Sequence, residues 1–118
     1  MFIENTTPTR EPAEHGALTI EVLWAEGTCV VHLGGDLDLD SVPILERELA
    51  PLIATRTGTL VVDLKGLRFI DSAGLRCLFE TASAAEARGD AVRFQRATGH
   101  VEEMLQLTDI KRQLRFVG

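Results

Sequence analysis

The stretch TLVVDLKGLRFIDSAGL, residues 59–75, decides the fold of this chain. Residues 59–64 form a short, nearly continuous apolar run, which is typical of a central strand covered on both faces. After the DSAG segment at 71–74, apolar residues recur at the spacing of an amphipathic helix that ends near Gly89. They are Leu75, Leu78, Phe79, Ala82 and Ala85. The stretch therefore predicts a buried strand that leads directly into a helix.

A hairpin is predicted upstream of this strand. Residues 18–24 and 28–37 are rich in apolar and β-branched residues, and a turn containing Gly27 separates them. With a period of two, one face of the first segment is apolar. That face carries Leu18, Ile20, Val22 and Trp24.

Further helices and strands fill the rest of the chain. Ser41 followed by Pro43 predicts a helix start, and an apolar stripe formed by Val42, Leu45, Leu49, Leu52 and Ile53 follows. Residues 91–95 predict another strand, and residues 114–117 a closing extended segment. A third helix between them is indicated by Val101, Met104, Leu105 and Thr108.

This order of elements, β-β-α-β-α-β-α with a final extended piece, predicts an α/β fold. Strands separated by single helices become parallel neighbours through right-handed crossovers, and the opening hairpin adds an antiparallel pair. We therefore expect one domain at residues 16–118, with a mixed sheet and with helices packed mainly on one face. Residues 1–15 have little apolar content and predict a flexible tail.

Composition argues against several classes of protein. The 118 residues suffice for one hydrophobic core, and the net charge of −6 with scattered cations opposes nucleic-acid binding. No apolar run approaches the roughly 20 residues of a membrane span, and the first residues lack the pattern of a signal peptide. We therefore expect a cytoplasmic protein that binds neither nucleic acid nor membrane.

The sequence also offers little for catalysis or metal binding. His15, His32 and His100 lack ligand spacing, and Cys29 and Cys77 lack a CxxC pattern, so we expect no metal or cofactor. Buried free thiols are favoured over a regulatory disulfide. Ser72 does not lie in a nucleophile elbow, because Ile70 stands where that motif needs glycine, and the sequence contains no P-loop. An enzyme is therefore not predicted.

An acidic segment, GGDLDLDS at 34–41, carries Asp36, Asp38 and Asp40 in alternation. It fails as a calcium loop because Ser41 and Arg47 stand where an EF-hand needs Gly and a bidentate Glu. Two interpretations remain open. The carboxylates either stabilise the N-terminus of the next helix or form an acidic rim at the end of a strand.

Ser72 lies between the predicted strand and helix, where its side chain can cap the helix. Gly74 in the first turn costs about 1 kcal/mol relative to Ala, which makes sense if something approaches the backbone closely there. A phosphate is one such group. On Ser72 it would add roughly −1.5 to −2 charges where helix N–H groups favour an anion, whereas a docked partner would be disturbed.

Three motifs together carry a family resemblance: Gly35-Asp36-Leu37-Asp38, then Val61-Val62-Asp63-Leu64, then the run from Phe69 to Leu75. Over about residues 17–117 the chain resembles the STAS-domain family, and within it the bacterial anti-sigma factor antagonists. The resemblance implies a protein that binds an anti-sigma factor and thereby frees a sigma factor. The anti-sigma factor would be a serine kinase of the GHKL ATPase type.

The resemblance also implies the switch residues. The kinase would phosphorylate Ser72 and so lower the affinity, and a phosphatase of the PP2C type would reset it. Ala73 stands where the family often has a second hydroxyl, which leaves Ser72 as the acceptor. The implied partner-binding surface comprises Asp36, Asp38, Asp40, Ser41, Asp71, Ala73, Gly74 and Arg76.

A second function stays open at this point. STAS domains also serve as scaffolds or regulatory subunits of larger assemblies, of the stressosome or lipid-transport kind, without a phosphorylation switch. Both interpretations make the protein a binding module rather than an enzyme.

Overall fold

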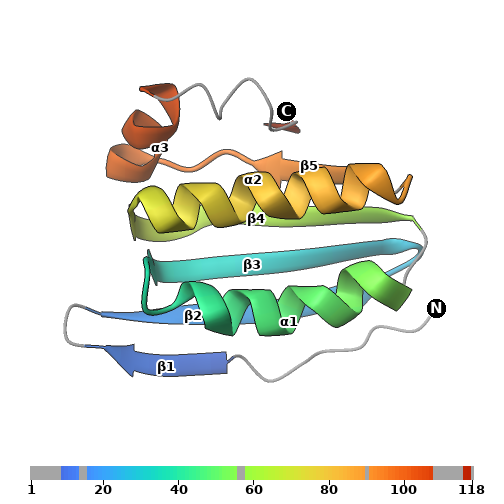
Figure 1. Ribbon diagram of the computed structural model, residues 1–118, viewed down its shortest axis with the longest axis horizontal. Coiled ribbons are helices and arrows are strands. Elements are labelled where there is room, and N and C mark those ends of the chain that lie inside the picture. The colour runs from blue at the N-terminus through green and yellow to red at the C-terminus, as the bar shows by residue number, and fades with distance from the viewer. Residues whose placement is uncertain (1–8, 14–15, 56–57, 90, 108–115, 118) are drawn as a thin grey trace.

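The computed structural model describes residues 9–13, 16–55, 58–89, 91–107 and 116–117. These residues form six strands and three helices, which Figure 1 shows. The strands are β1 (Thr9–Ala13), β2 (Gly16–Ala25), β3 (Thr28–Leu37), β4 (Thr59–Ile70), β5 (Ala91–Gln95) and β6 (Phe116–Val117). The helices are α1 (Val42–Thr55), α2 (Ser72–Ala87) and α3 (Gly99–Gln106).

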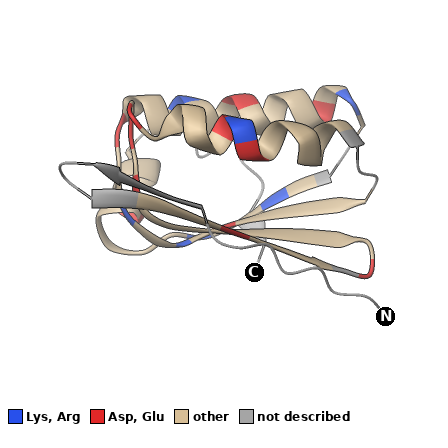
Figure 2. Cartoon of the chain, turned by 90° about the horizontal axis from the view of Figure 1, so that it is seen from below, with Lys and Arg blue, Asp and Glu red and all other residues tan. Residues whose placement is uncertain are grey.

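The strands lie in one sheet in their order along the chain. Strands β1, β2 and β3 are antiparallel neighbours, whereas β3, β4, β5 and β6 are parallel neighbours. Helices α1 and α2 lie side by side over one face of the sheet (Figures 1 and 2). The predicted α/β fold with a mixed sheet and helices mainly on one face is therefore confirmed.

The predicted hairpin is formed by β2 and β3. Glu26 and Gly27 have φ angles of 45° and 82°, and this left-handed backbone reverses the chain between the two strands. Leu18, Ile20 and Val22 are buried, and Trp24 packs against the same core, so the predicted apolar face is confirmed.

The flexible tail predicted over residues 1–15 was wrong for residues 9–13, because these residues form strand β1. β1 pairs antiparallel with β2, and Pro12 lies opposite Ala17. Backbone hydrogen bonds to the edge of a sheet need no apolar pattern, and an edge strand tolerates proline, so composition did not reveal this strand. Residues 1–8 and 14–15 lie outside the described residues. The domain boundary at residue 16 stays a prediction.

The core lies between the sheet and the helices. Leu45 and Leu49 of α1 and Leu75 and Leu78 of α2 are buried against strands β3, β4 and β5. Each such side chain contributes roughly 1.5–3 kcal/mol by leaving water. Helix α3 adds buried Val101 and Leu105, as the spacing predicted, whereas Thr108 lies outside the described residues.

Strand β4 is longer than its apolar run indicated and continues to Ile70. It pairs with β3 to the end, where Asp36 lies opposite Phe69 and Leu37 opposite Ile70. Two parallel strands thus end beside each other. The loop before α1 and the start of α2 therefore meet at the edge of the sheet formed by the carboxyl ends of β3 and β4. This is the place where α/β folds commonly bind ligands.

Candidate functional site

Asp71 connects the two chain segments that meet at this edge. Its main-chain N–H donates to the carbonyl of Leu37 at 3.3 Å. Its carboxylate accepts twice, from the N–H of Gly74 at 2.9 Å through Oδ1 and from the N–H of Leu39 at 3.1 Å through Oδ2. One side chain thus caps α2 and holds the loop that follows β3.

The prediction that Ser72 caps α2 was wrong, because Asp71 occupies the N-cap position. Asp71 has an extended backbone with φ −112° and ψ −173°, and its carboxylate bonds the N–H of Gly74. Ser72 is instead the first residue of the helix and is exposed. Asp and Ser are both good caps, so sequence alone did not separate two adjacent candidates. Among the described residues, the Ser72 hydroxyl has no hydrogen-bond partner.

Gly74 is needed because the chain itself passes close by. A Cβ at this position would lie 2.5 Å from the carbonyl oxygen of Leu37 and 2.7 Å from Cγ1 of Ile70. The predicted close approach to the backbone is therefore present. The group that makes it is the end of β3 rather than a phosphate.

The acidic loop is held mainly by its own hydrogen bonds. Oδ1 of Asp38 accepts from the N–H of Asp40 at 3.1 Å and from that of Ser41 at 3.0 Å. The Ser41 hydroxyl donates to the carbonyl of Asp36 at 2.9 Å and accepts from the N–H of Asp38 at 2.9 Å. Ser41 directly precedes α1, as expected, but its hydroxyl stabilises the loop rather than a helix N–H.

The three predicted carboxylates differ in exposure. Asp36 is buried, and its Oδ1 lies 3.5 Å from the guanidinium of Arg68. Asp38 is half-buried, and Asp40 is exposed. The interpretation as helix-stabilising carboxylates therefore fits Asp38, which bonds the N–H groups just before α1, whereas Asp36 pairs with Arg68. Asp40 presents an exposed charge in this loop.

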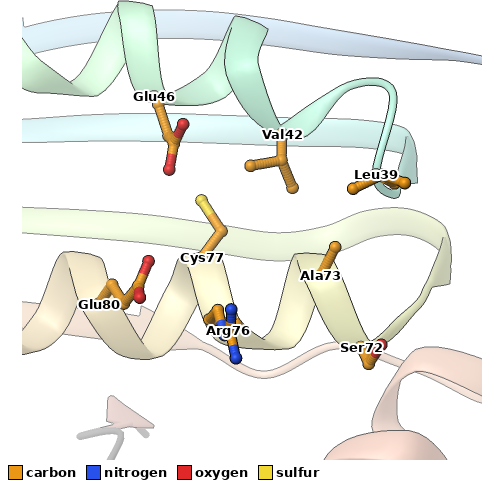
Figure 3. A pocket seen from close by; sticks show the side chains of 8 residues that line it. All are labelled: Leu39, Val42, Glu46, Ser72, Ala73, Arg76, Cys77 and Glu80. Atoms are coloured by element: carbon orange, nitrogen blue, oxygen red, sulfur yellow. The ribbon is translucent and has the colours of Figure 1, made fainter.

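A groove of about 470 Å³ runs between α1 and α2 beside this loop (Figure 3). Three of the predicted residues line it: Ser72, Ala73 and Arg76. The other lining residues, which were not predicted as site residues, are Leu39, Val42, Glu46, Cys77 and Glu80.

Leu39 is the most informative of the missed residues because 72% of its surface is exposed. Its apolar side chain stands in the acidic run DLDLD, and the alternation there resembles a strand with one buried face. The signal that could have found it is the capping pattern at Asp38 and Ser41, which places Leu39 in the connecting loop.

The thiol of Cys77 faces this groove (Figure 3), although the residue is almost fully buried. Burial raises the pKa of Cys77 to about 11, and the carboxylates of Glu46 and Glu80 act in the same direction. A hydrogen bond with Thr81 opposes them. Cys77 and Cys29 are both buried thiols, and neither is part of a disulfide, which confirms the prediction of buried thiols.

The two histidines in the described ranges, His32 and His100, have different partners. His32 Nδ1 lies 2.7 Å from Oδ2 of the buried Asp63, across strands β3 and β4. His100 is the second residue of α3 and stacks on Phe69, with ring centroids 5.4 Å apart. His15 lies outside the described residues, and within the described ranges no group of three or more His, Cys, Asp or Glu could hold a metal ion.

The chain matches a known protein family. A family model described as "Mlab, STAS domain" matches residues 20–117, which is most of the chain. The chain belongs to the STAS-domain family. In the described part of this STAS domain, no helix is both long enough and apolar enough to cross a membrane.

Proteins similar to this STAS domain include anti-sigma factor antagonists. The anti-sigma-F factor antagonist RsfB of Mycobacterium tuberculosis is 32% identical over 78 residues, which cover 66% of this chain and 62% of RsfB. The chain thus matches somewhat less than two thirds of the length of RsfB.

Three solved structures show the same fold. An anti-sigma factor antagonist from Mycobacterium paratuberculosis has a TM-score of 0.72 at 24% identity, with 84% of each chain covered. SpoIIAA of Bacillus, in its unphosphorylated form, has a TM-score of 0.69 at 18% identity, with 84% of this chain and 88% of SpoIIAA covered. SpoIIAA in its phosphorylated form has a TM-score of 0.64 at 17% identity, with 84% and 91% covered.

Proposed function

We propose that this STAS domain is an anti-sigma factor antagonist that is switched off by phosphorylation at Ser72. Unphosphorylated, it binds an anti-sigma factor of the GHKL serine-kinase type and so frees a sigma factor. A PP2C-type phosphatase restores the binding form. The similarity to RsfB and to the two forms of SpoIIAA supports this proposal.

The exposed hydroxyl of Ser72 is the observation that carries the proposal. It stands at the first position of α2, without a hydrogen-bond partner among the described residues, on the rim of the groove between α1 and α2. An exposed serine at a helix start is open to a kinase. The fold also tolerates the product, because free N–H groups and the helix dipole favour an anion at this end.

Partner binding would centre on the exposed Leu39. This side chain and Ser72 line the same groove, and Asp71 fixes the Leu39 backbone to the start of α2. A large exposed apolar side chain on a rigid support is typical of a protein interface. A partner seated on Leu39 would therefore cover Ser72 as well.

Phosphorylation would act directly on this interface. Ser72 Oγ forms a bond to the γ-phosphorus of ATP while the bond from this phosphorus to the bridging oxygen of ADP breaks. The hydroxyl proton passes to a base of the kinase, and ADP leaves with the kinase and its Mg²⁺. The product carries roughly −1.5 to −2 added charges. Burying such a charge unpaired costs several kcal/mol, and each 1.4 kcal/mol is tenfold, so a loss of affinity of about a hundredfold or more is expected.

No catalytic step falls to this chain in the proposed cycle. ATP and Mg²⁺ belong to the kinase, and the STAS domain supplies only the acceptor hydroxyl and the docking surface. It therefore acts as a binding module and a substrate, and it needs no cofactor of its own.

The experiment is phosphate mapping with candidate anti-sigma kinases of the same organism. The protein is incubated with kinase, ATP and Mg²⁺ and mapped by mass spectrometry, with Ser72→Ala and Ser83→Ala compared. Ser83 is an exposed serine on the same helix and is the matched control. We expect label on the wild type and on Ser83→Ala, and none on Ser72→Ala.

Binding measurements complete the test. Ser72→Ala is expected to bind the kinase throughout, whereas Ser72→Glu and Ser72→Asp bind weakly. Equal affinity of all three variants would refute the switch. Phosphate at another residue, or at none, would favour a scaffold or regulatory subunit of a larger assembly.

A further inference from the structure

We propose that Arg76 is the partner of the phosphate on Ser72, so that the modified serine is held along α2 by this chain's own guanidinium. The inference rests on the proposed function, since it assigns a positioning residue to the same switch.

The positions of the two residues on α2 carry the inference. Ser72 and Arg76 are four residues apart, and side chains at this spacing lie on one side of a helix with Cβ atoms about 5–6 Å apart. Figure 3 shows both side chains on the same edge of α2, whereas Ala73 and Cys77 project toward α1. An acidic group followed by a cation four residues later is the favourable orientation of such a pair.

Arg76 is free to take this role in the unmodified protein. It is exposed, and it forms neither an ion pair nor a hydrogen bond with any residue in the described ranges. Glu80 and Glu46 line the same groove and leave the area around Arg76 acidic. Neither carboxylate lies within ion-pair distance of the guanidinium, since no such pair is found among the described residues.

Phosphorylation of Ser72 changes the charges around Arg76. Phosphoserine presents three strong acceptor oxygens, and a guanidinium bonds phosphate through two parallel N–H groups. The phosphate also lies nearer the positive end of the helix than Glu80 does. Arg76 should therefore turn toward residue 72 and withdraw its positive charge from the groove, so that a docking partner meets both the phosphate and the loss of this cation.

The test introduces phosphoserine at position 72 directly during translation, so that no kinase is needed. The second pKa of the phosphate is measured by phosphorus NMR in the otherwise wild-type chain and in Arg76→Gln, Arg76→Lys and Arg47→Gln. Arg47 is an exposed arginine on α1 and serves as the matched control.

A nearby cation favours the doubly charged phosphate, so pairing lowers this pKa. We expect the phosphate pKa to rise by roughly half a unit in Arg76→Gln, with Arg47→Gln unchanged and Arg76→Lys in between. High salt should reduce the difference, because the pair is exposed.

Equal phosphate pKa values in the wild type and Arg76→Gln would overturn the role of Arg76. This outcome is independent of the proposed function, which fails instead if phosphoserine 72 leaves the affinity for the anti-sigma factor unchanged. Thermal unfolding of the same four proteins confirms that each is folded at the temperature of the measurement.

Discussion

The main-chain N–H of Leu39 donates a hydrogen bond of 3.1 Å to Oδ2 of Asp71, 32 residues further along the chain. The other oxygen of the same carboxylate caps α2 at Gly74. The exposed Leu39 and the exposed Ser72 are thereby held in one fixed arrangement. A single carboxylate thus couples the loop after β3 to the helix that carries the proposed acceptor.

Asp71→Ala should destabilise the protein by about 1–2 kcal/mol, because α2 loses its cap and Leu39 loses its backbone partner. Asp71→Asn, which keeps a side-chain oxygen, should lose less. Urea unfolding measures both against Asp40→Ala, a change at an exposed carboxylate of the same site. If Asp71→Ala and Asp40→Ala unfold at the same urea concentration, Asp71 does not hold the two segments together.

Gly74→Ala should destabilise the protein by about 1–3 kcal/mol, although alanine is intrinsically the better helix former. The added Cβ would lie 2.5 Å from the carbonyl oxygen of Leu37, so β3 and α2 have to separate. Ser83→Ala, on an exposed position of the same helix, should be neutral or slightly stabilising. The comparison fails if both substitutions shift the unfolding midpoint in the same direction.

Leu39→Ala should weaken binding of the anti-sigma factor about tenfold or more, while the free energy of unfolding changes by less than about 0.5 kcal/mol. Leu107→Ala provides the control, since Leu39 and Leu107 are 72% and 81% exposed and Leu107 follows α3. Titration calorimetry with the purified partner gives both affinities. An equal effect of the two substitutions would argue against a docking surface centred on Leu39.

The raised pKa of Cys77 predicts that the protein loses stability in alkaline solution. Its pKa is about 11 in the folded protein and near 9 when unperturbed, so the folded state holds this proton more tightly. The contribution of this proton to the free energy of unfolding is complete below pH 9. It is lost as the pH rises from about 9 to about 11, because the thiol of the unfolded chain ionises first. Urea unfolding across this range should show the decline in the wild type.

Cys77→Ala is the variant that checks this assignment, because it removes the ionising group and should flatten the decline. Cys29→Ala removes the other buried thiol and is the matched control. The rate of thiol alkylation gives a second measure of the Cys77 pKa. With Cys29 removed, native Cys77 should react on the order of a hundredfold more slowly near pH 8 than the same thiol in urea. Equal rates would contradict the raised pKa.

Much of the fold followed from local patterns in the sequence. The apolar run at 59–64, the hairpin with its turn at Gly27, and the stripes on both long helices each reflect burial against one core. Periodicity reports burial directly, because a strand alternates and a helix repeats every 3.6 residues. Strand β1 escaped this reasoning, since its pairing with β2 uses backbone groups, which leave no periodic pattern in the sequence.

The α/β order, the family motifs and the position of Ser72 at the start of a helix followed from the sequence alone. The three-dimensional arrangement was needed to show that Asp71 caps that helix, that Leu37 rather than a ligand crowds Gly74, and that Leu39 stands exposed beside Ser72. The reason is physical. The contacts of Leu37 with Gly74 and of Leu39 with Asp71 join residues more than 30 positions apart, and they exist only where the parallel strands β3 and β4 end side by side.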